Sequence, residues 1–249
     1  MFVEQERYGL DILETLIRFA ILSLFSFWIS GIIHELGHII TGLLHGWKFW
    51  LLVVGPIGIK KDEKKLKAYF EKNPALWGGV GGTIPSDENV DNVKIWAKVL
   101  LAGPIASIVT GVIFLSFNFI HFSLAFVLLG AMPIAMGIAC LLPFTTGITY
   151  TDGKRWARLR SEGQGRAEEI SLFKMMMANI FEKDESTIEY DDFAPLLKAE
   201  LPAIKYYGYF YLYRYYRARN DEENKLKALE ELSVLKRNTP KIVVDDCMI

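Results

Sequence analysis

The segment HELGH at positions 34–38 fits the pattern H-E-x-x-H, in which two histidines are one helical turn apart. On a helix, residues four apart have Cβ atoms about 5–6 Å from one another, so His34 and His38 can bind one metal ion. Zinc suits imidazole and carboxylate ligands, and it lowers the pKa of a bound water from about 15.7 to about 7. Glu35, beside the first histidine, can accept the proton of that water. The segment therefore predicts zinc-dependent hydrolysis.

The sequence around this segment is strongly apolar. From Phe19 the residues FAILSLFSFWISGII carry no charge, and the apolar pattern continues beyond Glu35 to Trp47. One alternative is that the polar residues of the segment are incidental. A charged group at the centre of a membrane helix costs about 2.5–3.5 kcal/mol on insertion scales, and a sequence rarely carries that cost without a function. The apolar setting therefore strengthens the prediction of a metal site.

A catalytic zinc site uses three protein ligands, so the third must come from elsewhere in the chain. Asp152, which precedes a glycine just after the third apolar run, is our candidate, and an ordinary Asp-Gly turn is the alternative. His45 lies about 10 Å further along the helix axis than His38 and is interpreted as an interfacial histidine. The predicted site therefore has Glu35 as its catalytic residue and Zn²⁺ as its cofactor. Its predicted metal ligands are His34, His38 and Asp152.

Three apolar runs predict membrane spans at about residues 19–46, 97–120 and 122–145. A helix over the first run would be about 40 Å long, enough to cross a hydrocarbon core of about 30 Å. The very short connection between the second and third spans predicts an antiparallel pair. The loop after the first span contains Gly55-Pro56 and a glycine-rich run at 78–82, which favour a strand pair or a re-entrant segment. No Gly-Lys-Ser/Thr follows that run, so a strand or turn near the active site is favoured over a phosphate loop.

The composition agrees with a membrane protein, because 51% of the residues are hydrophobic and the mean hydropathy is +0.22. Cys140 and Cys247 are too few for a disulfide framework or a cysteine zinc cluster. We predict a mainly α fold: a polytopic helical membrane protein with a three-helix catalytic core, a short β or re-entrant segment after the first span, and a C-terminal soluble helical region.

The charge distribution predicts an orientation for this fold. Lysines and arginines follow the first and third spans, at 60–72 and 154–160, whereas the turn between the second and third spans has none. By the positive-inside tendency, we expect the active site toward the cytoplasmic side and the C-terminal region in the cytoplasm. The predicted domains are a membrane-embedded core at 1–160 and a cytoplasmic helical domain at 161–249. Helical periodicity in the latter predicts helices at 167–182, 206–219 and 222–236.

These segments together resemble the site-2 protease family of intramembrane zinc metalloproteases. The resemblance rests on HELGH at 34–38, on Ala102-Gly103-Pro104 in the second span, and on Leu142-Pro143 followed by Asp152-Gly153. It covers roughly residues 15–160 and implies a core of three helices, with the Asp-Gly pair at the end of the third. Where the family pattern N-x-x-P-x-x-x-x-D-G has asparagine, this chain has Cys140. The residues 144–151 separate Pro143 from Asp152, a longer spacing than the four residues of the family pattern.

The resemblance and the motif together predict hydrolysis of a peptide bond in or near the membrane segment of a membrane-anchored protein or peptide. The substrate would bind as an extended segment, with 53–59 or 80–85 offering a strand edge. The lipid bilayer is an expected partner, nucleic acid is not, and the C-terminal helices could bind a protein. The alternatives are a non-catalytic membrane scaffold with a structural zinc site, in which loss of Glu35 or a ligand would be expected, and a metal transporter, which would need further polar residues in the spans.

Overall fold

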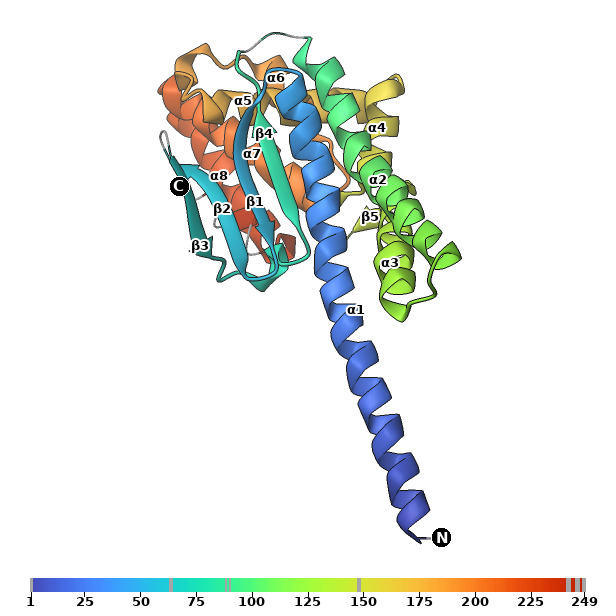
Figure 1. Ribbon diagram of the computed structural model, residues 1–249. Coiled ribbons are helices and arrows are strands. Elements are labelled where there is room, and N and C mark those ends of the chain that lie inside the picture. Colours follow the sequence, from blue (N-terminus) through green and yellow to red (C-terminus); the bar gives the residue numbers. More distant parts are fainter. Residues whose placement is uncertain are drawn as a thin grey trace. The chain divides into compact units, whose positions relative to one another are not determined.

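The structure is a computed structural model that describes residues 2–62, 65–87, 89, 91–146, 149–240, 243, 244 and 247, with only the backbone for 2–11 (Figure 1). Lys64 of the predicted basic loop lies outside the described residues. The chain forms two compact units, the first made of residues 1–83 and 98–140 and the second of residues 84–97 and 141–249. The predicted fold class is confirmed, because the described chain is mainly α with a small sheet after the first helix. The predicted domain boundary at residue 160 and the predicted orientation stay predictions.

Three of the described helices are long and apolar enough to cross a membrane. The candidate spans are Ile12–Leu44, Asn92–Phe119 and Leu124–Leu141. The first belongs to α1, Phe2–Leu44, which begins well before the predicted start near residue 19. The reason is that the early residues include good helix formers and no proline, and charged side chains do not end a helix.

Glycine ends α1 just beyond the H-E-x-x-H segment. Gly46 has a φ of +83°, a left-handed backbone that glycine adopts without the penalty of a Cβ atom. The amide of Trp47 then donates to the carbonyl of Gly42 at 3.0 Å and closes the last turn of the helix. The chain leaves α1 in a fixed direction and enters the sheet directly.

The loop after α1 folds into a four-stranded sheet with the order β3-β2-β1-β4, which confirms the prediction of strands in this region (Figure 1). Its strands are β1 Lys48–Val54, β2 Ile57–Asp62, β3 Lys65–Phe70 and β4 Val80–Ile84. The Gly55-Pro56 turn joins β1 to β2, and the two strands pair antiparallel with Val54 opposite Ile57. Since β1 and β2 lie inside the sheet, the predicted strand edge at 53–59 is already paired, whereas β4 lies at an edge.

The second and third spans are α2, Asn92–Ser116, and α3, Leu124–Leu141. They approach closely through glycine, since a Cβ atom on Gly111 would lie 2.5 Å from the carbonyl oxygen of Gly130. Helix α3 ends before Pro143, earlier than the predicted end near residue 145, because the residue before a proline disfavours the helical conformation.

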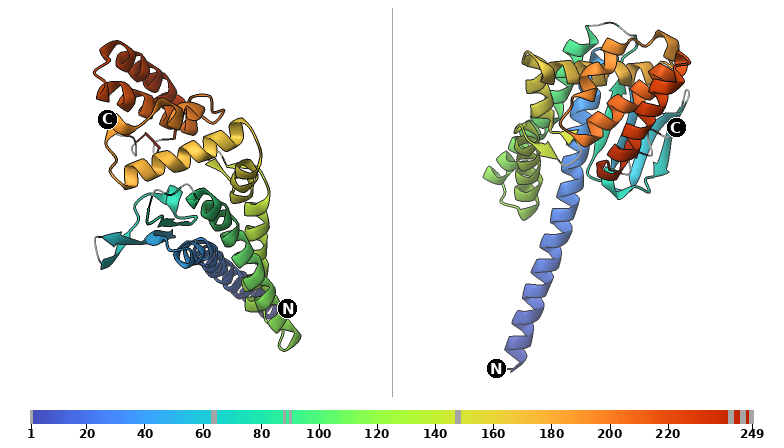
Figure 2. Two further views of the ribbon diagram at one scale, coloured as in Figure 1. Left: turned by 90° about the horizontal axis from the view of Figure 1, so that it is seen from above. Right: turned by 180° about the vertical axis from the view of Figure 1, so that it is seen from behind.

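The second unit contains five described helices, coloured from yellow to red in Figure 2. They enclose a core in which Phe193 and Leu196 are fully buried. They are α4 Asp152–Arg160, α5 Gln164–Ile180, α6 Tyr190–Leu197, α7 Pro202–Ala218 and α8 Glu222–Leu235. Helices α5, α7 and α8 match the three helices that the sequence pattern predicts, whereas α4 and α6 are short and were not predicted. A two-stranded hairpin, β5 Thr145–Thr146 and β6 Thr149–Tyr150, precedes α4.

Candidate metal centre

Helix α1 presents His34 and His38 to the same point. Their Nε2 atoms are 3.2 Å apart, and the two rings meet edge to face with centroids 4.9 Å apart. Both residues are buried, with 5% and 8% of their surface exposed. The predicted pair of histidines is therefore brought together with the ring nitrogens converging.

Helix α2 provides the hydrogen-bond partners for the Nδ1 atoms of both histidines. His38 Nδ1 donates to the carbonyl oxygen of Val99 at 2.6 Å, and this bond leaves the lone pair of Nε2 available. His34 Nδ1 lies 3.2 Å from the hydroxyl oxygen of Ser107, a residue with no exposed surface. Partners of this kind fix the ring orientation of histidines that bind metals.

The donor geometry fits a zinc ion. Two nitrogens at about 2.0–2.1 Å from a tetrahedral zinc would be about 3.3 Å apart, close to the observed separation of the two Nε2 atoms. Zinc binds imidazole through a ring nitrogen that carries a lone pair, and the contact with Val99 leaves Nε2 of His38 in that form. His34 and His38 would therefore hold the metal without rearrangement of their rings.

Helix α2 reaches this position through glycine. A Cβ atom on Gly103 would lie 2.3 Å from His38 Nε2, and a Cβ atom on Gly37 would lie 2.6 Å from the carbonyl oxygen of Ala102. Both distances are far below a normal contact, so a larger residue at either position would separate the helices or turn the ring. This explains why the Ala102-Gly103-Pro104 segment faces α1 at the level of the site.

The glycine-rich segment encloses the carboxylate of Glu35. Cβ atoms on Gly79 and Gly81 would lie 2.8 Å from Oε1 and 2.7 Å from Oε2 of that carboxylate. Gly79 also has a φ of +119°, which only glycine adopts readily. The glycine-rich run of the sequence is thus a turn and the start of β4, beside a catalytic candidate that is 9% exposed.

Cys140 on α3 lies close to His34 within the first unit. The ligand atoms of Cys140 and His34 are within 4.8 Å of each other. This is the position at which the family pattern has asparagine, and it was not among the predicted ligands.

The third predicted ligand, Asp152, belongs to the second unit and is the first residue of α4. Thr151 caps this helix by accepting from the amide of Lys154, and its hydroxyl donates to the carbonyl oxygen of Leu142 at 2.7 Å. A Cβ atom on Gly153 would lie only 1.9 Å from the carbonyl oxygen of Leu141, so the glycine allows the chain to pack against the end of α3. The amide of Thr151 also donates to Phe144 at 3.2 Å, which closes the β5–β6 hairpin at its base. Of this connection, residues 145, 146, 149 and 150 pair in the hairpin, and the start of α4 returns to the end of α3.

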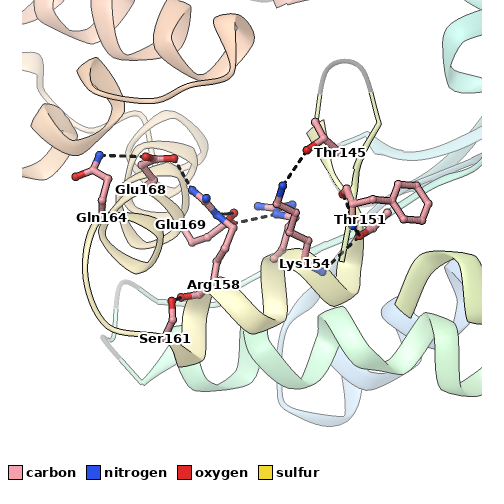
Figure 3. A network of polar contacts seen from close by, with 10 residues as sticks. Thr145, Thr151, Lys154, Arg158, Ser161, Gln164, Glu168 and Glu169 are labelled. Atoms are coloured by element: carbon pink, nitrogen blue, oxygen red, sulfur yellow. Dashed lines mark hydrogen bonds and ion pairs between the residues drawn. The ribbon is translucent and has the colours of Figure 1, made fainter. Parts of the chain in front are cut away.

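Helix α4 is fixed by ionic contacts along its length (Figure 3). Lys154 Nζ donates to the hydroxyl of Thr145 at 2.9 Å. Arg155 and Arg158 each pair with the carboxylate of Glu169 on α5, at 3.0 Å and 3.2 Å, and that carboxylate has no exposed surface. Arg158 also pairs with Glu168 and lies over the ring of Tyr150, with 4.3 Å to its centroid. Burial raises the pKa of Tyr150, against the opposing effect of Arg158, so the ring stays neutral at pH 7.

His45 makes its hydrogen bonds at the end of α1, and its interpretation as an interfacial histidine stays a prediction. Its Nδ1 donates to the carbonyl oxygen of Thr41 at 2.8 Å, and its Nε2 accepts from Lys98 at 3.2 Å. The side chain is exposed, and both ring nitrogens are engaged at the end of α1. His45 is therefore not part of the pair formed by the other two histidines.

Comparison with known protein families identifies the family of the chain. The sequence model of Peptidase family M50 matches residues 22–233, which is most of the chain and includes the paired histidines, the sheet and Asp152. No curated protein and no solved structure matches the chain.

Proposed function

The chain belongs to Peptidase family M50, and we propose that it is an intramembrane zinc endopeptidase of the site-2 protease type. The family membership and three apolar helices make it a membrane metallopeptidase. The proposal adds that the scissile bond lies in or near the membrane segment of an anchored protein or peptide. The observation that carries it is the position of the histidine pair and Glu35 on α1, inside a candidate span.

We propose that His34, His38 and Asp152 hold the zinc ion. The support for Asp152 is its Asp-Gly motif, the match of the family model, and the contacts that return the start of α4 to the end of α3. A zinc ion at this position supplies Lewis acidity that polarises the carbonyl under attack. Glu35 takes the proton of the attacking water and passes it to the leaving nitrogen.

The substrate would bind as an extended strand along β4. This strand lies at an edge of the sheet, and Gly81 on it is next to the carboxylate of Glu35. An extended peptide added to a sheet edge presents its carbonyl groups at regular positions, whereas the peptide bonds of a helix are shielded. The position of β4 therefore offers a way to hold the scissile bond near the proposed base.

Metal content tests the ligand set. Purified in detergent and loaded with zinc, wild-type protein is expected to hold a single zinc ion per chain by elemental analysis. His34→Ala, His38→Ala and Asp152→Ala are each expected to hold less zinc after dialysis, because each change removes a protein ligand of the metal. His45→Ala serves as the matched control and should keep the metal. Retention of zinc by Asp152→Ala would move the third ligand elsewhere, and retention by either of the other two variants would overturn the site.

Cleavage of matched peptides tests the mode of substrate binding. Two synthetic single-span peptides of about 20 apolar residues, reconstituted with the protein in liposomes, would differ only in a central Gly-Pro pair in place of Leu-Leu. The pair opens the helix locally, so the Gly-Pro peptide is expected to be cut and the Leu-Leu peptide to stay intact, as read by mass spectrometry. Equal cleavage of both peptides would contradict binding as an extended segment.

A further inference from the structure

Cys140 is a second candidate ligand for the metal that the histidines hold. A glycine contact explains its position: a Cβ atom on Gly137 would lie 2.7 Å from the carbonyl oxygen of Pro104 and 3.2 Å from the Cβ atom of Ser107. Ser107 is the residue whose hydroxyl lies 3.2 Å from His34 Nδ1. The same residue of α2 thus contacts α3 on one side and the metal-binding helix on the other.

Cys140 lies three residues after Gly137 and therefore on the same face of α3, one turn further along. That turn places its sulfur within 4.8 Å of a ring nitrogen of His34. A sulfur at about 2.3 Å and a nitrogen at about 2.05 Å from one tetrahedral zinc ion are about 3.6 Å apart. This distance lies within the 4.8 Å limit on the separation of the Cys140 sulfur and the His34 nitrogen, so both side chains can bind one ion.

We propose that the Cys140 thiolate binds the same zinc ion as His34 and His38 in the resting protein. The proposal rests on the metal site of the proposed function and adds a sulfur ligand to it. Thiolate is a softer donor than the carboxamide of asparagine and binds zinc strongly, so the exchange at this position changes the ligand set of the metal. With Asp152 as a further ligand, the thiolate takes the fourth position, which catalytic zinc sites leave to water. In the resting protein the metal would then have no position left for water. The substrate would have to displace the thiolate before hydrolysis.

Cobalt substitution tests this ligand directly, without any measurement of activity. Cobalt(II) accepts the same ligands as zinc, and a thiolate bound to it gives an intense charge-transfer band in the near ultraviolet that nitrogen and oxygen ligands do not give. Whole protein in detergent, loaded with cobalt, is expected to show this band. Cys140→Ser is expected to retain cobalt and lose the band.

The other cysteine provides the matched control. Cys247 is buried in the second unit, in contact with the core around Tyr206, and Cys247→Ser is expected to keep the band unchanged. A wild-type protein that binds cobalt without the band, or a band that persists in Cys140→Ser, would overturn the proposal while leaving the histidine site intact. Wild-type protein that takes up no cobalt would overturn the metal site, and this inference with it.

Discussion

Replacement of Glu35 by glutamine is expected to lower the rate of peptide-bond hydrolysis by about 10²–10⁴-fold while the zinc content stays unchanged. Glutamine has the shape of glutamate and fits between Gly79 and Gly81, but its amide cannot accept a proton from the attacking water. The histidines keep their contacts with Val99 and Ser107, so the metal should remain bound. The measurement is kcat for the cleavable Gly-Pro peptide, together with elemental analysis of the same samples.

Another glutamate of the same helix serves as the control. Glu14 is exposed and pairs with Arg18 at 2.5 Å, so Glu14→Gln removes the same charge from α1 away from the histidines. It should keep activity within a few-fold of the wild type. A zinc-loaded Glu35→Gln variant with near wild-type activity would rule out Glu35 as the base and favour the scaffold alternative.

Replacement of Glu169 by glutamine is expected to destabilise the folded protein by about 3–5 kcal/mol. The Glu169 carboxylate has no exposed surface and pairs with both Arg155 and Arg158. These two arginine side chains are 23% and 18% exposed. Without Glu169, Arg155 loses its paired carboxylate while largely buried, and Arg158 keeps only Glu168. For a chain of this size the loss corresponds to a decrease in Tm of roughly 6–20 °C, and the exposure of the two guanidinium groups favours the lower end. Circular dichroism of the detergent-solubilised protein measures the shift.

Glu185→Gln is the matched control in the same unit. Glu185 also pairs with two arginines, but it is 22% exposed, and Arg214 and Arg217 are 20% and 47% exposed. Ion pairs that solvent reaches contribute less than a pair with a fully buried carboxylate, so the Tm of this variant should fall by less than that of Glu169→Gln. Equal Tm values for Glu169→Gln and wild type would show that the buried network does not hold α4 on α5.

The histidine pair could be predicted from the sequence because its geometry is local. Residues four apart on any helix share a face, so His34 and His38 needed only a helix to converge. Their partners on α2 were not predicted. The sequence could have indicated Ser107, since a polar residue in an apolar span usually faces protein. It could not have indicated Val99, because this residue accepts the hydrogen bond with its backbone carbonyl and not with its side chain.

The surroundings of Asp152 show where sequence patterns were insufficient. The long spacing after Pro143 was visible, but its accommodation in the β5–β6 hairpin depends on hydrogen bonds between Thr151, Leu142 and Phe144. Helix α4 is short and strongly polar, so its apolar periodicity was too weak to predict it. Cys140 was noted only as a departure from a pattern, because its distance from His34 depends on the packing of three helices.

The length of α1 limits how the protein can sit in a bilayer. The candidate span Ile12–Leu44 contains 33 residues and is about 50 Å long, whereas the hydrocarbon core is about 30 Å thick. Even a tilt of about 40°, near the upper limit for membrane helices, accommodates only about 26 of those residues. The charged Glu14–Arg18 pair favours placing the N-terminal end of the span outside the hydrocarbon. The residues inside the hydrocarbon then begin near Phe19. His34 and His38 would lie about 22–29 Å along the helix axis from that border, so the tilt of α1 sets the depth at which the proposed protease must receive the scissile bond.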